Sequence, residues 1–228
     1  MSPNKLSSTL AEMLGDLIDD NLVAFDEVTI EVSASNLIEV CKILQTDAAL
    51  AFTQMIDLCG VDYSAYGSTE WQTESASGGG FGRGVDSTLE NESQWDKPRF
   101  ASVMHLLSVD NNQRLRVKTF VDEDDLKIPS VTQIWSSADW YERESFDLYG
   151  LLYEGHEDLR RILTDYNFVG HPFRKDFPLV GHVEMRYDAT ERRCIYEPVT
   201  IEQRINVPKV IRDDLRYGLD NEDSAEQA

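Results

Sequence analysis

Carboxylates, arginines and histidines crowd into one stretch of this chain, between Trp140 and Leu179. Glu144 and Asp147 stand three residues apart, which places them on adjoining surface of a helix, and His156 follows shortly after. Such a set could bind a metal ion or exchange protons. The spacing matches no HExxH or HxxEH motif and no other ligand set of known geometry. A free-standing metal-dependent enzyme that uses these three residues is therefore an alternative that we keep but do not favour.

The same stretch has the composition of a protein interface. Tyrosine, tryptophan and arginine dominate binding hot spots, and here they alternate with carboxylates that can pair with the arginines. We expect a helix over residues 139–149 that Asp139 caps and Gly150 ends, with Arg143 and Asp147 paired at i,i+4. The predicted interface residues are Trp140, Glu142, Arg143, Glu144, Asp147, His156, Arg160, Arg161, Arg174 and Lys175.

Other catalytic and cofactor-binding patterns are missing from the sequence. The glycine-rich segment 78–84 lacks the third glycine of GxGxxG, and no GK[ST] follows it. No GxSxG nucleophile motif occurs. The three cysteines, Cys41, Cys59 and Cys194, form no CxxC pair and are too few for a cluster held by four thiolates. We predict that this chain binds no cofactor and no metal of its own.

The charge and hydropathy of the chain narrow the class of partner. A formal net charge of -21 excludes nucleic acid and disfavours anionic lipid, because both repel an acidic protein. The longest apolar runs are far shorter than the roughly 20 residues that cross a bilayer. The first 25 residues resemble neither a secretory signal nor a transit peptide. The sequence therefore predicts a globular protein that recognises other proteins.

The first half of the chain alternates helix and strand patterns. We expect an amphipathic helix over residues 6–24 and a half-buried strand at 28–32. A second helix should follow Asn36, which forms a capping-box pattern with Glu39. Residues 52–63 read as a buried strand. The clearest hairpin joins 99–109 to 114–121 through a turn at 110–112, with Leu115, Val117, Thr119 and Val121 facing inward.

This order of elements predicts an α+β fold, a mostly antiparallel sheet with helices packed on one face, followed by an extended C-terminal arm. We expect a globular domain over 1–135 with a flexible hairpin insertion at 64–98, a signature segment at a subunit interface over 136–188, and the arm over 189–228, which ends in a disordered tail. Residues 195–201 have no obvious sheet partner. Their apolar side chains need cover from the domain or from another protein.

The motif ERESFDLYG at 142–150, with GHEDLRRILTDY at 155–166 and GHPFRKDFPL at 170–179, resembles the signature of the 30-kDa subunit family of proton-pumping NADH:quinone oxidoreductase, the C subunit of bacterial respiratory complex I. Segments 57–63, 129–131 and 181–188 are similar to the same family. Glu157 departs from the pattern, because the family usually has proline there. The insertion at 78–84 is a second departure.

The resemblance implies a peripheral-arm subunit without redox centres, with the flavin FMN and the iron–sulfur clusters in partner subunits. It implies packing against the larger D subunit (49-kDa type) near the quinone site, with the C-terminal arm extending over that partner. Membrane association would then come only through the complex, on the cytoplasmic side of a bacterial inner membrane. The equivalent subunit of a related membrane-bound hydrogenase, or of another quinone-linked complex, remains an alternative.

Overall fold

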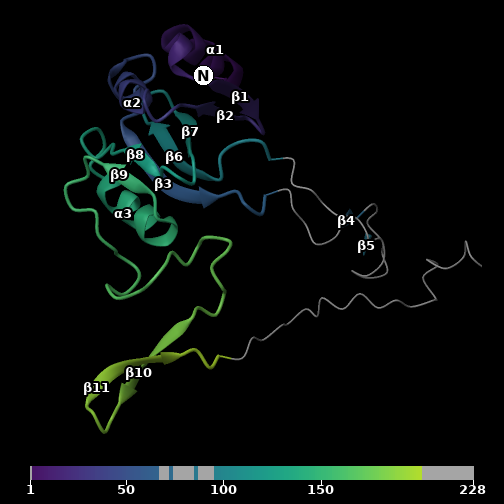
Figure 1. Cartoon of the computed structure of the whole chain (residues 1–228). Coiled ribbons are helices and arrows are strands. Elements are labelled where there is room, and N and C mark those ends of the chain that lie inside the picture. The colour runs from purple at the N-terminus through teal and green to yellow at the C-terminus, as the bar shows by residue number, and fades with distance from the viewer. Residues whose placement is uncertain (1, 67–71, 74–84, 87–94, 202–228) are drawn as a thin grey trace, which may run out of the picture. The chain divides into compact units, whose positions relative to one another are not determined.

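A computed structural model describes residues 2–66, 72–73, 85–86 and 95–201 (Figure 1). The chain divides into two compact units. One unit joins Met1–Ser64 to Trp95–Gly181, and the other joins Ala65–Gln94 to His182–Ala228. The glycine-rich segment 78–84 and the expected disordered tail lie outside the described residues.

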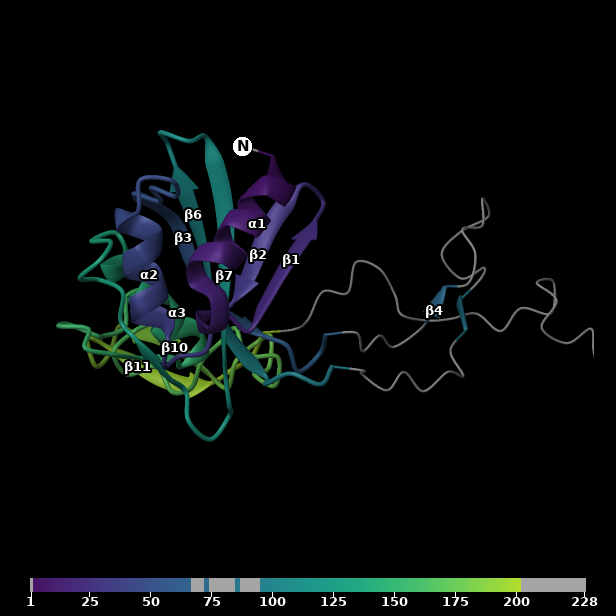
Figure 2. The ribbon, with the colours of Figure 1, turned by 90° about the horizontal axis from the view of Figure 1, so that it is seen from above.

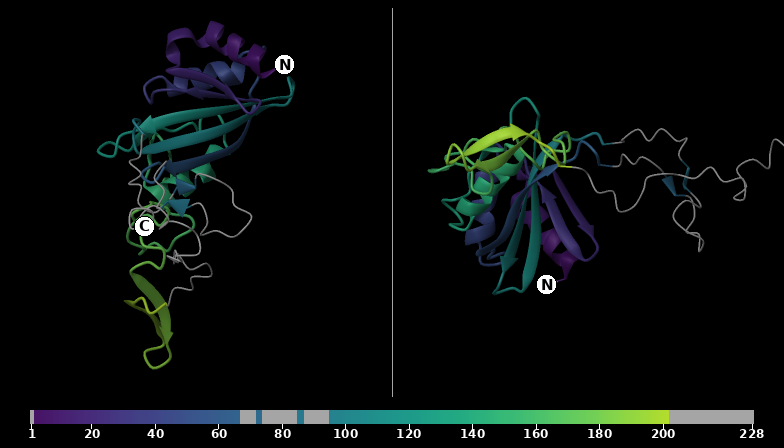
Figure 3. Two further views of the ribbon diagram at one scale, coloured as in Figure 1. Left: turned by 90° about the vertical axis from the view of Figure 1, so that its right-hand side faces the viewer. Right: turned by 90° about the horizontal axis from the view of Figure 1, so that it is seen from below.

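A five-stranded sheet forms the centre of the first unit. Its strand order is β1-β2-β7-β6-β3, and only the β2–β7 pair is parallel. The strands are β1 (Asp20–Ala24), β2 (Glu27–Glu31), β3 (Gln54–Asp62), β6 (Phe100–Ser108) and β7 (Gln113–Val121). The two longest central strands, β6 and β7, form the predicted hairpin (Figure 3). The prediction of a mostly antiparallel sheet is therefore confirmed.

Alternation along the strands gives the sheet two different faces. One face carries the predicted inward side chains of β7, together with Ile30, Met104 and Leu58 from the neighbouring strands. Helices α1 (Pro3–Leu14), α2 (Leu37–Thr46) and α3 (Ala138–Tyr149) pack on this covered face, and Figure 2 shows α1 and α2 over the strands. The other, open face carries Thr29, Asp57, His105, Arg114, Arg116 and Lys118.

The N-terminal helix is shorter than predicted. Helix α1 ends at Leu14, a single 3-10 turn covers Gly15–Leu17, and the chain then enters β1 at Asp20. The apolar residues of 20–24 look helical in spacing, but the β1–β2 pairing takes them into the sheet. The expected helix α2 is present and begins after Asn36. Its predicted capping box is absent, because no side chain caps this helix.

Helix α3 approaches the sheet closely over one glycine of β3. A Cβ atom at Gly60 would stand 2.6 Å from Tyr149 Cδ2 and 2.8 Å from Ser145 Oγ. Next to this contact, Tyr153 joins α3 to β6 through hydrogen bonds between its hydroxyl and those of Ser145 and Ser102. Tyr153 belongs to β9 (Leu152–Glu154), which pairs in parallel with β8 (Lys127–Pro129). The signature helix is thus built into the domain core.

The second unit contains a C-terminal hairpin. Strand β10 (Val183–Asp188) pairs antiparallel with β11 (Arg193–Pro198). The expectation that residues 195–201 have no sheet partner is therefore wrong for 195–198. Earlier in the chain, β4 (Gln72–Thr73) and β5 (Val85–Asp86) form a short antiparallel pair inside the predicted hairpin insertion.

Candidate functional site

No side chain caps the N-terminal end of the signature helix α3, and a glycine ends it. Ser137 is its N-cap, with no side-chain cap, so the predicted cap by Asp139 is wrong. Gly150 ends the helix as predicted, in the left-handed conformation with φ 80° that favours glycine. Charged residues are usually exposed, but four polar or charged residues of this helix are buried: Glu142, Arg143, Ser145 and Asp147.

Glu142 ties the segment before the helix to the helix itself. Its side chain is fully buried and accepts hydrogen bonds from Ser130 Oγ at 2.7 Å and from the Val131 N–H at 2.8 Å. No arginine or lysine pairs with it in the described part of the chain. Burial therefore raises the pKa of Glu142, and the two hydrogen bonds only partly oppose this rise. This carboxyl holds structure in place rather than presenting a charge.

Arg143 does not pair with Asp147, contrary to the i,i+4 prediction. Its guanidinium donates to the main-chain oxygens of Arg160 at 3.1 Å and Arg161 at 3.2 Å. It also lies 5.3 Å from the ring centroid of Trp140, which is itself 61 % exposed. Arg143 thus holds the main chain of residues 160–161 in place, and its guanidinium packs against the exposed ring of Trp140.

Asp147 receives the densest set of hydrogen bonds in the site. Arg161 donates to its Oδ1 at 2.8 Å, and the N–H groups of Ile162, Leu163 and Thr164 donate to its Oδ2. The Thr164 hydroxyl donates to Oδ1 as well. Burial raises the pKa of Asp147, but the hydrogen bonds from Thr164, Leu163 and Arg161 outweigh burial and bring it down to about 2. The ionised carboxylate therefore anchors loop 161–164 to α3.

Two histidines brace the same loops. His171 Nδ1 donates to the main-chain oxygen of Asp147 at 2.9 Å. Burial, together with nearby Arg174 and Arg161, lowers the pKa of His171 and keeps its ring neutral near pH 7. His156 Nδ1 accepts from the Asp158 N–H at 3.0 Å, so Nε2 carries the proton that faces the Asp139 main-chain oxygen at 3.2 Å. The Asp158–His156 bond orders the turn at Glu157.

Sequence reasoning missed a second anchor, built on Asp62 and Arg99. Arg99 donates to Asp62 at 2.9 Å and also pairs with Asp176 and Glu123. Burial opposes ionisation of Asp62, but the bonds from Arg99 and from the Lys175 N–H hold the pKa of Asp62 well below its usual range. The available signal was weak: Asp62 ends the strand, but Asp57 in the same strand is also acidic.

The basic pair Arg174-Lys175 acts inside the chain. Arg174 Nε donates to the Tyr149 main-chain oxygen at 2.7 Å, and its guanidinium lies 4.9 Å from the ring centroid of Phe100. Lys175 contributes its main-chain N–H to Asp62. Together with Arg161, which also donates to Gly170 at 2.9 Å, these contacts fix loop 161–177 on the domain.

The structure does not bring together the residues of the metal-enzyme alternative. Asp147 is saturated by its own loop, His156 faces Asp139, and Glu144 is exposed on α3. Among the described residues, no group of three or more histidine, cysteine, aspartate or glutamate side chains could hold a metal ion. Of the signature carboxylates, Glu142 and Asp147 serve as internal anchors.

Large apolar side chains project from the anchored loops. Leu163, Tyr166, Val169, Phe173 and Leu179 are each more than half exposed, and Leu179 reaches 95 %. Arg160, also exposed, pairs with Asp158 at 2.8 Å and donates to the Tyr166 hydroxyl at 3.1 Å. Buried ion pairs thus hold in place a surface that leaves much apolar area in water.

A model of the family described as "Respiratory-chain NADH dehydrogenase, 30 Kd subunit" matches residues 30–183. This chain belongs to that family. It is therefore a subunit of an NADH:quinone oxidoreductase, and the resemblance seen in the sequence is confirmed.

Two bacterial relatives of the family span nearly the whole chain. The C subunit of NADH-quinone oxidoreductase from Coxiella burnetii strain Dugway 5J108-111 is 54% identical over 214 residues, which cover 92% of this chain and 94% of the relative. The protein of the same name from Legionella pneumophila strain Corby is 54% identical over 220 residues, covering 96% and 95%.

A solved structure shares the fold at lower identity. A chain of the membrane-bound sulfane sulfur reductase, described as an archaeal respiratory membrane complex, aligns with TM-score 0.53 and 20% identity over 78% of this chain and 86% of that one. This similarity supports a shared fold and nothing further. None of the helices in the described part of this family member has the length and apolar character to span a bilayer.

Proposed function

We propose that this chain is a non-redox-active subunit of the peripheral arm, and that it supports the quinone-reducing module by binding the larger D subunit (49-kDa type). Electrons would pass from NADH through FMN and iron–sulfur clusters of partner subunits to quinone, coupled to proton translocation. The chain would sit at the cytoplasmic side of a bacterial inner membrane through these partners. A hydrogenase-type parent complex has less support, because relatives at 54% identity carry the NADH-quinone oxidoreductase name.

The observation that carries this proposal is the exposed apolar surface of loop 161–179. Monomeric proteins rarely leave contiguous large apolar side chains in water, and such patches mark contacts with other proteins. Here the patch stands on a rigid frame, because Asp147 and Asp62 tie its loop to α3 and β3. A preformed surface loses little entropy on binding, which favours docking.

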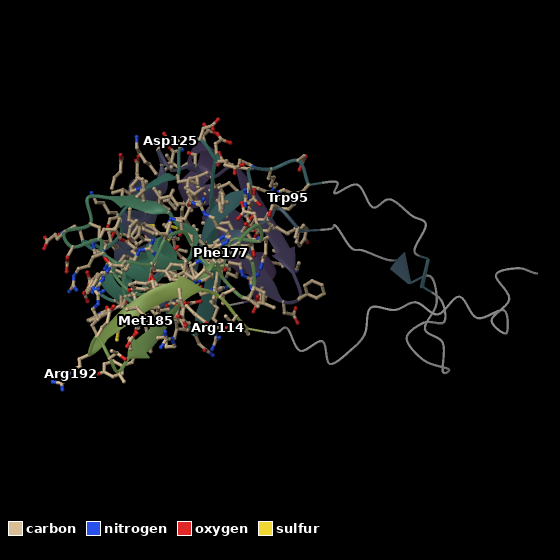
Figure 4. All side chains as sticks on the ribbon, turned by 60° about the horizontal axis from the view of Figure 1, so that its bottom comes forward. Trp95, Arg114, Asp125, Phe177, Met185 and Arg192 are labelled. Atoms are coloured by element: carbon tan, nitrogen blue, oxygen red, sulfur yellow. The ribbon has the colours of Figure 1, made fainter. Side chains whose placement is uncertain are left out.

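The C-terminal hairpin supports the proposal independently. Its register places Val183, Met185 and Tyr187 on one face with Pro198, Tyr196 and Cys194, and all six are exposed (Figure 4 labels Met185). The opposite face carries the ion pair Arg186–Glu197 at 2.8 Å. A two-stranded hairpin is marginally stable by itself. An apolar face on such a hairpin needs a partner surface to cover it.

Cys194 offers a native probe of this docking. We expect a maleimide to label Cys194 rapidly in the chain expressed alone with a solubility tag, and slowly in the assembled complex purified from membranes. The matched control replaces Arg193 with cysteine in a Cys194→Ser background, since position 193 lies on the opposite face of the hairpin. Equal labelling of Cys194 in both preparations would count against docking through this face.

A cross-link identifies the partner. Chemical cross-linking of the intact complex, read by mass spectrometry, should join Lys175 or the segment 183–198 to the D subunit. A stable monomer that ignores the D subunit in a pull-down would contradict the proposal. Stoichiometric metal and activity in the chain alone, lost on Glu144→Gln, would instead revive the metal-enzyme alternative.

A further inference from the structure

We infer that two copies of this chain pair through the free edge of strand β10 when the chain is not in the complex. The pairing joins the two-stranded hairpins of both copies into one continuous antiparallel sheet. It uses the main chain of β10 and the side chains that this strand carries. It does not depend on which subunit the chain later binds.

The outer edge of β10 has main-chain groups that β11 does not use. Val183 pairs with Pro198, and one step outward the Val199 N–H donates to the His182 oxygen at 3.3 Å. Hydrogen-bonded and non-hydrogen-bonded pairs alternate along an antiparallel ladder. The odd-numbered residues of β10 therefore point their N–H and C=O groups away from β11: Val183, Met185 and Tyr187. No other strand in the described part of the chain pairs with this edge (Figure 1).

Strand β11 offers a poorer edge for pairing. Its outward-pointing groups belong to Cys194, Tyr196 and Pro198, and a proline has no N–H to donate. Proline at such a position protects an edge against further pairing. Strand β10 contains no proline, and its register with β11 has no bulge. The edge of β10 is thus the one that is open to another strand.

The sequence of β10 is complementary to itself about Met185. In an antiparallel pair of two copies centred on this residue, Met185 lies opposite Met185, and Val183 lies opposite Tyr187. On the other face, Glu184 of each copy lies opposite Arg186 of the other copy. Opposite charges directly across a ladder stabilise it. This register overlaps residues 183–187, whereas centring on Tyr187 overlaps only 186–188 before the turn.

Within one copy, Glu184 has no cation opposite it. Its partner across the hairpin is Glu197, a second carboxylate, and Arg186 forms its ion pair with Glu197 at 2.8 Å. Glu184 accepts a hydrogen bond from the Thr200 hydroxyl at 2.8 Å. Like charges directly opposite each other destabilise a sheet. Arg186 of the second copy would supply the positive charge that Glu184 lacks, so charge complementarity favours the register centred on Met185.

Pairing of two copies should stabilise a hairpin that is marginal alone. A two-stranded hairpin is at best marginally stable in water, whereas three or more strands with an apolar face can be stable. The new ladder would bring together side chains that are each more than half exposed: Val183, Met185 and Tyr187. One pair of strands is a small contact, so the association should be weak and reversible. It leaves the apolar face accessible for docking.

Disulfide trapping of the full chain, expressed alone with a monomeric tag, tests this register. In a Cys194→Ser background, Met185→Cys places a thiol on the two-fold axis, where opposing Cα atoms are about 5.5 Å apart and a disulfide can form. Tyr196→Cys is the matched control, because Tyr196 lies opposite Met185 on the same face and is 51 % exposed against 52 %.

We expect oxidation with copper phenanthroline to give a covalent dimer from position 185 about fivefold faster than from position 196, whose Cα atoms lie too far apart across the axis. Equal rates from the two positions, or no dimer from position 185, would overturn the inference.

Charge reversal then tests the pairing of Glu184 with Arg186. Glu184→Arg places like charges opposite each other in the dimer and should lower the yield from position 185 about threefold. The same change removes the like-charge pair with Glu197, so a lower yield cannot come from a weaker hairpin. Adding Arg186→Glu restores opposite charges between the copies and should restore the yield. A yield that Glu184→Arg does not lower, or that the double variant does not recover, would contradict the register.

Discussion

Arg161 reaches back 14 residues to donate a 2.8 Å hydrogen bond to Asp147, whose side chain is fully buried while that of Arg161 is 17 % exposed. The pair joins a helix of the core to the loop that carries the exposed apolar residues. Main-chain N–H groups of the loop complete the coordination of the carboxylate. The shape of the proposed docking surface therefore depends on one buried charge.

Replacing that charge should release the loop. Asp147→Asn removes the charge and one of the two acceptor oxygens, so the oxygen that remains cannot serve both Arg161 and the three main-chain N–H groups. We expect a loss of about 3–5 kcal/mol in the free energy of unfolding. Urea denaturation of the tagged chain measures this loss of stability. Trypsin should also cut faster after Arg161.

The matched control is Asp158→Asn. Asp158 pairs with Arg160 at 2.8 Å, but both side chains are more than half exposed, so solvent screens the pair. We expect no measurable change in stability or in trypsin cleavage. Equal effects of the two substitutions would show that Asp147 is not the anchor of the loop.

Glu142 and Asp147 should change the free energy of unfolding with pH in opposite directions, because the folded pKa is raised for Glu142 and lowered for Asp147. Because burial raises the folded pKa of Glu142, the folded state keeps a proton that the unfolded state releases above the ordinary value of 4.5. The free energy of unfolding therefore falls as pH rises from there through the folded pKa. Glu142→Gln lacks this titration and can still accept from Val131 and donate to Ser130.

We expect Glu142→Gln to gain stability relative to the unsubstituted chain above pH 4.5, with the gain growing as pH rises through the folded pKa of Glu142. Urea midpoints at several pH values above 4.5 measure the difference. A constant difference would mean that the carboxyl is ionised in the folded protein throughout.

Gly60 should tolerate no side chain. A methyl group there would meet Tyr149 at 2.6 Å and Ser145 at 2.8 Å, and α3 would have to move. Gly60→Ala should lower the free energy of unfolding by about 1–3 kcal/mol. Tyr149→Ala should relieve part of that loss, so the double variant should be more stable than the sum of the single changes predicts. Strict additivity would show that the helix does not press on Gly60.

Local sequence patterns were enough to predict part of the sheet. The alternation of 114–121 and its turn predicted the β6–β7 hairpin, and Gly150 predicted the end of α3. The helix predicted from the apolar spacing of residues 6–18 was wrongly extended to residue 24, because pairing with β2 decides the conformation of 20–24. Residues 183–188 alternate as a strand does, but the prolines at 198 and 208 favoured an extended arm, so the pairing of β10 with β11 was not predicted.

The partners of the charged residues could not be read from spacing. The i,i+4 rule pointed Arg143 at Asp147, yet a loop 15 to 17 residues further on supplies Asp147 with three N–H donors. The Arg99–Asp62 pair spans 37 residues and links two strands whose register only the fold determines. Arg143, Asp147 and Arg161 were named from the sequence, but as interface residues, and Asp62 and Arg99 were not named. The internal contacts of all five needed the tertiary structure.

We propose that this protein holds the complex together and performs no redox chemistry. The most direct test measures NADH:quinone turnover and the amount of assembled complex in the same membranes, for Arg160→Ala and for Val169→Ser with Leu179→Ser. These side chains are exposed, so the fold should survive. Loss of interface contacts should lower assembly about fivefold or more, with turnover per assembled complex unchanged. Full assembly with reduced turnover per complex would contradict the account.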